Sequence, residues 1–186
     1  MHSHTGSPMT ISLSADIDAA LHTGLNDLTQ SMHPSGNTAT RDQRVDQLLA
    51  SLKPPANAHA RECLRAGLYL LAGDLHQAHE ICQAVPTAHG SAWHAIVHRR
   101  EGDFWNSKYW WRRATGLTFP SLPAAIRESL PALPTELTPC LTNNTYNPAA
   151  FVDLVEQHAK GPALREPLLI VQRLEFAALL AEGLNS

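Results

Sequence analysis

The sequence is poor in the features that mark several common classes of protein. It has three cysteines among 186 residues, no CxxC pair, no glycine-rich phosphate loop and no GxSxG motif. An odd number of widely spaced cysteines builds neither a disulfide framework nor a zinc finger, so we expect reduced thiols. The missing motifs argue against P-loop nucleotide hydrolysis and α/β-hydrolase chemistry.

An excess of positive charge and long apolar runs are also lacking. Lysine and arginine number 14 against 17 acidic residues, and the net charge of −3 argues against a nucleic-acid partner. No stretch approaches the roughly 20 apolar residues of a membrane-spanning helix, and the first residues carry no signal-peptide pattern. The sequence predicts a cytoplasmic protein with no membrane partner and leaves the oligomeric state open.

The pattern that is present is helical, since no alternating strand pattern competes with the three- and four-residue spacing of the apolar residues. It predicts an all-α fold of antiparallel, tetratricopeptide-like helical hairpins with about seven to eight helices. A disordered tail is expected at 1–13 and a single helical domain at 14–186. Within the domain we expect a central hairpin pair, a proline-rich connector and C-terminal helices, at 66–115, 116–147 and 148–186.

Two Gly-Asp pairs organise the central region. Gly73-Asp74 and Gly102-Asp103 each stand between two helical patterns, where glycine can end one helix and aspartate can cap the next. Ser91 is the expected cap of the helix between them, and Thr40 is the expected cap of an earlier helix. This arrangement predicts two capped helical hairpins in succession.

Several sequence blocks in this region resemble known families. The segment GLYLLAGDLHQAHEI at 67–81 resembles a degenerate tetratricopeptide or Sel1-type repeat. The runs WHAIVHRREGD at 93–103 and NSKYWWRR at 106–113 resemble an uncharacterised family of mostly helical proteins with WHxxxHRREGD and NxKYWxRR blocks. That likeness covers roughly residues 66–182. The resemblance implies helices and brings no activity with it.

One helix stripe carries residues suited to metal chemistry. His94 and His98 are spaced to reach one metal ion from a single helix face, and His79 on the preceding hairpin is a candidate third ligand. Glu101 lies on the same stripe and is the candidate catalytic base of a zinc- or other divalent-metal-dependent hydrolase. The simpler alternative is that these histidines form hydrogen bonds within helix interfaces.

A second set of residues combines aromatic rings with arginines. Such a surface predicts a scaffold or adaptor that binds a protein, a peptide or a small anionic ligand without a cofactor, and this is the leading functional hypothesis. Its expected contact residues are Trp93, Arg99, Arg100, Tyr109, Trp110, Arg112 and Arg113.

Overall fold

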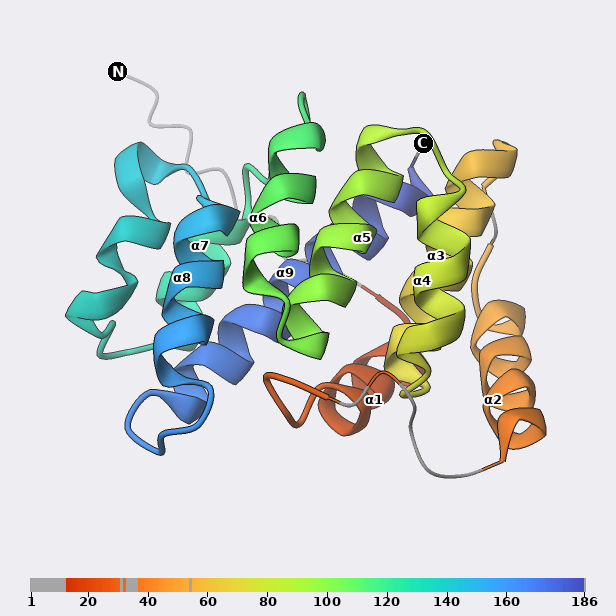
Figure 1. Cartoon of the computed structure of the whole chain (residues 1–186), viewed down its shortest axis with the longest axis horizontal. Helices are drawn as coiled ribbons and strands as arrows, with labels where there is room; N and C mark the ends of the chain where they lie inside the picture. Colours follow the sequence, from red (N-terminus) through yellow and green to blue (C-terminus); the bar gives the residue numbers. More distant parts are fainter. Residues whose placement is uncertain (1–12, 31, 33–36, 54, 186) are drawn as a thin grey trace, which may run out of the picture.

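The computed structural model describes residues 13–30, 32, 37–53 and 55–185, and the regular structure in these ranges is entirely helical (Figure 1). The predicted all-α class is confirmed. The helices are α1 Ala15–Gly24, α2 Thr38–Ala50, α3 Ala58–Leu71, α4 Leu75–Gln83, α5 Ala88–Glu101, α6 Phe104–Arg113, α7 Leu122–Ser129, α8 Pro148–His158 and α9 Arg165–Leu184, with 3-10 helices η1 Thr135–Cys140 and η2 Thr142–Asn144.

The helices thus outnumber the seven to eight that the sequence predicts, even within the described ranges. The predicted tail at 1–13 lies outside the described residues except for Leu13, which packs against the core. The predicted connector at 116–147 contains α7 and both 3-10 helices. It contributes Leu122, Ile126 and Leu137 to the buried core. The connector is therefore part of the packed structure.

The two Gly-Asp pairs form tight helix-to-helix turns, as predicted. Gly73 and Gly102 have φ angles of 80° and 89°, a left-handed region where a Cβ atom would be strained. Asp74 and Asp103 follow them, and each side chain accepts a hydrogen bond from a backbone N–H in the first turn of the next helix. The turns place α4 beside α3 and α6 beside α5. Membership of a tetratricopeptide-like repeat stays a prediction.

Two predicted helix starts are wrong by three or four residues. The side chain of Thr87, rather than that of Ser91, caps α5 by accepting a hydrogen bond from the Gly90 backbone, and Asn37 rather than Thr40 caps α2. Gly90 lies in the first turn of α5. In the structure a Cβ atom at this position would lie only 2.2 Å from the Val85 carbonyl oxygen, so glycine is required by close packing inside the helix.

Helix α5 is the centre of the structure. Every residue from Gly90 to Arg100 is buried, because α5 packs against α3, α4 and α6, while α9 packs against α1, α3 and α7 (Figure 1). The apolar side chains form one cluster that extends from Ile17 to Leu180. In the described chain no helix is both long and apolar enough to cross a bilayer. The fold therefore encloses a helix that carries histidines and arginines.

Candidate functional site: a three-histidine cluster

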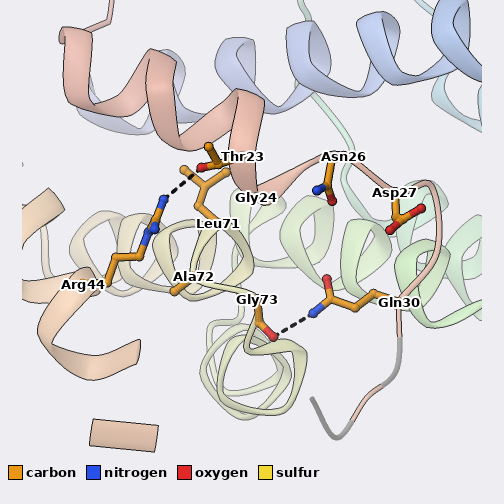
Figure 2. A pocket seen from close by; sticks show the side chains of 9 residues that line it. All are labelled: Thr23, Gly24, Asn26, Asp27, Gln30, Arg44, Leu71, Ala72 and Gly73. Atoms are coloured by element: carbon orange, nitrogen blue, oxygen red, sulfur yellow. Dashed lines mark hydrogen bonds between the residues drawn. The ribbon is translucent and has the colours of Figure 1, made fainter. Parts of the chain in front are cut away.

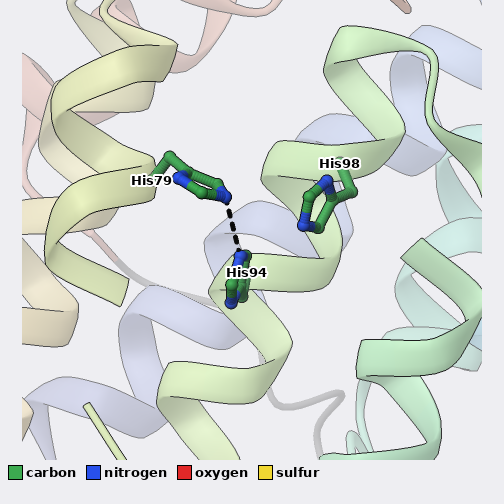
Figure 3. A group of neighbouring side chains, drawn as sticks. All are labelled: His79, His94 and His98. Atoms are coloured by element: carbon green, nitrogen blue, oxygen red, sulfur yellow. Dashed lines mark hydrogen bonds between the residues drawn. The ribbon is translucent and has the colours of Figure 1, made fainter. Parts of the chain in front are cut away.

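Three histidine side chains meet between α4 and α5. His94 and His98 project from successive turns of α5, and His79 reaches toward them from α4 (Figure 3). One ligand nitrogen from each ring can be chosen so that all three lie within 4.8 Å of one another. The structure therefore brings together the three residues that the sequence singles out as candidate metal ligands.

The closest contact in the cluster joins two ring nitrogens. His79 Nε2 and His94 Nε2 are 2.9 Å apart, and their rings meet edge to face. Burial, reinforced by the nearby His98 and His79 rings, lowers the pKa of His94 to about 3, and burial also lowers the pKa of His79. Both rings are thus neutral at physiological pH, where one Nε2 donates the proton and the other accepts it. Neutral imidazole is the form that binds metals.

Glu101 forms a hydrogen bond with the third ring, that of His98. The carboxylate of Glu101 makes a very short hydrogen bond with His98 Nδ1, and Asp103 Oδ2 lies 4.0 Å from the same nitrogen. A carboxylate on Nδ1 fixes the proton there and leaves Nε2 with its lone pair, an arrangement typical of metal-bound histidine. This contact gives Glu101, the candidate base, a positioning role. Asp103, which also caps α6, is therefore a second carboxylate beside His98.

His94 is held by ring stacking. Its imidazole stacks on Trp110 of α6, with ring centroids 4.0 Å apart, and on His98, with centroids 4.7 Å apart. The Nδ1 atom of His94 is buried and has no hydrogen-bond partner in the described structure. His94 and His98 are almost fully buried, whereas His79 is half-buried and forms the solvent-facing side of the cluster.

The dimensions of the cluster suit a small divalent ion. Three imidazole nitrogens that bind zinc at about 2.0–2.1 Å in tetrahedral geometry lie about 3.4 Å apart. One pair of nitrogens is 2.9 Å apart, closer than that value, and all three lie within 4.8 Å of one another. The three nitrogens are therefore near the spacing that a zinc ion requires, and the Glu101 carboxylate lies beside His98.

The fold buries some residues of the predicted aromatic and arginine surface and exposes others. Trp93, Arg99 and Arg100 are almost fully buried, so they cannot contact a ligand at the surface, and this part of the prediction is corrected. The Trp93 ring packs edge to face against Phe176 and lies against Gly67. The sequence pattern could not place these residues inside because α5 is buried on every side, which no single apolar stripe reveals.

The two buried arginines have structural partners instead. Arg99 forms an ion pair with Glu175 of α9, whose other carboxylate oxygen accepts a hydrogen bond from the Tyr146 hydroxyl at 2.8 Å. The guanidinium of Arg99 also lies over the Phe151 ring. The sequence gives no signal for this network, because its members are far apart along the chain.

Arg100 supports the segment that follows α1. Its guanidinium donates hydrogen bonds to the Gly24 carbonyl and to Gln30 Oε1, while Gln30 Nε2 donates to the Gly73 carbonyl at 2.7 Å. Gln30 and Gly73 line a hollow of about 290 Å³ (Figure 2). Arg44 and Thr23 also line it, and Arg44 donates a hydrogen bond to the Thr23 hydroxyl. Arg100 therefore joins this segment to α5, and Gln30 joins it to the α3–α4 turn.

The remaining predicted contact residues lie on α6. Arg112 and Arg113 are exposed, Tyr109 is partly exposed and Trp110 is half-buried beside the histidines. Trp105 also belongs to this surface, since its ring is parallel to that of Tyr109. The prediction missed Trp105, although its four-residue spacing from Tyr109 could have indicated it.

Comparison with known proteins adds no assignment. No family model, curated protein or solved structure matches the chain. The functional argument therefore rests on the residues of the cluster and its surroundings.

Proposed function

We propose that this protein binds a divalent transition metal, zinc in the first instance, through His79, His94 and His98. The observation that carries the proposal is the convergence of three imidazoles from two helices, with one ring nitrogen of each within 4.8 Å of the others. Nitrogen ligands of this kind suit zinc and its neighbours in the first transition series, whereas calcium and magnesium prefer oxygen. Glu101 supports the site by fixing the proton of His98 on Nδ1.

A titration of the metal-free protein with zinc, followed by calorimetry and by elemental analysis after dialysis, tests this proposal. We expect one tightly bound ion per chain. The His94→Ala and His79→Ala variants should each lose more than about 100-fold in affinity, because a residue that binds the metal directly contributes at least as much as the residues that support it. His59→Ala is the matched control, since His59 is exposed on α3. If the wild-type protein retains no stoichiometric metal, or if His94→Ala retains it fully, the proposal is wrong.

Metal-assisted hydrolysis is the second candidate function. It is supported by the number of histidines, because a zinc site with three protein ligands leaves a coordination position for water, as in catalytic sites. The half-buried position of His79 gives this site a route to solvent. The test is the zinc-dependent hydrolysis of 4-nitrophenyl acetate and 4-nitrophenyl phosphate, with His94→Ala as the control. Stoichiometric zinc without hydrolysis of either substrate, or of related esters and amides, would assign the metal a structural role.

A further inference from the structure

An exposed aromatic pair marks the outer face of α6. The large apolar side chains that are exposed in the described structure are Trp105, at 71%, and Tyr109, at 38%. They lie one helical turn apart with nearly parallel rings, at an interplanar angle of 11° and a centroid distance of 6.2 Å. Single exposed apolar residues are common, but adjacent exposed aromatic rings are typical of interaction sites.

Two arginines without carboxylate partners border this pair. The Arg113 guanidinium lies 5.9 Å from the centroid of the Tyr109 ring and 5.4 Å from that of Trp110, and Arg112 is exposed beside it. In the described part of the chain neither arginine forms an ion pair, whereas Lys108 on the same helix binds Asp153 and Glu156. The face therefore presents two arginines that form no ion pair within the described residues.

The shape of this face favours a macromolecular partner. A tryptophan that is 71% exposed does not lie in a concavity, and small ligands bind mainly in concave pockets. Trp, Tyr and Arg are also the residue types that are enriched in the energetic centres of protein interfaces. We propose that Trp105, Tyr109, Arg112 and Arg113, the α6 face, dock an acidic segment of a partner protein.

Charge complementarity selects a short acidic segment over a nucleic acid. The α6 helix is bordered by Asp103 at its start and by Asp153 and Glu156, which are half exposed, along α8. A nucleic acid carries a long, continuous run of negative charge past these carboxylates, and the net charge of the chain is −3, whereas a short segment can end at the two arginines. An acidic peptide can pair with the two arginines while its apolar side chains cover the aromatic rings.

The test uses fluorescence anisotropy of a short labelled peptide in which glutamate alternates with leucine and phenylalanine. We expect saturable binding that weakens with salt, and no binding of the same peptide with lysine in place of glutamate. Trp105→Ala should weaken binding by about tenfold or more, as a central aromatic contact does, and Arg113→Gln should weaken it and reduce its salt dependence. Lys53→Gln, which removes one exposed charge after α2, is the matched control and should change nothing.

Four results would overturn the proposal. They are absence of acidic-peptide binding, full binding by Trp105→Ala, tighter binding of single-stranded oligouridine than of the peptide, and concentration-dependent self-association that Trp105→Ala abolishes. The last two would assign the face to nucleic acid or to a second copy of the chain. Zinc affinity measured on Trp105→Ala should equal that of the wild type, so the docking face and the proposed metal site can fail independently.

Discussion

Helix α5 has two polar faces with different surroundings. On one face Arg99 meets Glu175, and both side chains are completely buried, with the Tyr146 hydroxyl and the Phe151 ring completing the environment. On the other face His94 and His98 meet His79 of α4, with one ring half-buried. The first face joins opposite charges, whereas the second gathers three groups of the same kind.

This difference separates a structural network from a candidate functional one. A buried guanidinium requires a counter-charge, so Glu175 is needed for the fold once Arg99 is inside. Neutral imidazoles have no such requirement, and the buried His94 Nδ1 has no hydrogen-bond partner in the described structure. Apolar side chains would fill the same space without this unmet polar group. The packing of α5 thus accounts for the presence of its buried arginines better than for that of its histidines.

The largest effect should come from breaking the arginine face. Glu175→Gln removes the charge opposite Arg99 and leaves a buried cation without a partner, which costs about 3–5 kcal/mol of unfolding free energy. Urea denaturation measures the change. The control is Asp153→Asn, which weakens the partly exposed ion pair with Lys108 and should cost less than about 1 kcal/mol. Equal losses in the two variants would show that the buried pair has no special structural role.

The next largest effect should come from removing the carboxylate charge beside His98. Glu101→Gln keeps the size of the side chain but removes the charge that holds His98 Nδ1–H, so zinc affinity should fall by about 10- to 100-fold. Calorimetric titration measures the loss. Glu80→Gln removes the same charge from an exposed position one residue from His79 and should change the affinity much less. An unchanged affinity in Glu101→Gln would remove Glu101 from the site.

A smaller effect is expected when a histidine becomes apolar. His94→Leu should change the stability of the metal-free protein by less than about 1 kcal/mol, because the volume is similar and a polar group with an unpartnered nitrogen is lost. Urea denaturation of the metal-free protein measures this change in stability. A loss near that of Glu175→Gln would make the histidine face a structural network like the arginine face.

The smallest effect distinguishes the three histidines from the buried cysteines as zinc ligands. Burial raises the pKa of Cys63 to about 11 and that of Cys140 to about 12, and it raises the pKa of Cys82 as well. Little of the reactive thiolate is present at pH 8, so the folded protein should react slowly with a disulfide reagent at that pH and rapidly when unfolded. Adding zinc to the folded protein should leave the rate unchanged. A zinc-dependent change would indicate a thiolate ligand.

The sequence predicts the local features of this molecule well. Asp74 and Asp103 cap helices because a carboxylate can accept the first free N–H groups, and the glycines before them adopt the left-handed conformation that the turns require. The spacing of His94 and His98 fixes their common face by helix geometry alone. These inferences need only neighbouring residues, so one sequence is enough.

Long-range features could not be predicted in the same way. The burial of Arg99 depends on Glu175, which is 76 residues away in the chain. The assignment of Arg99 and Trp93 to a binding surface failed for this reason. His79 was placed near His94 only through the expected packing of hairpins.

X-ray absorption spectroscopy of the zinc-loaded protein tests the central claim most directly, because it reports the ligands of the metal. The account predicts three imidazole nitrogens at about 2.0–2.1 Å and one further light atom, with the imidazole signal reduced in His94→Ala. A spectrum with sulfur ligands, with fewer than three imidazoles, or with no change in His94→Ala would contradict the assignment of the metal to His79, His94 and His98.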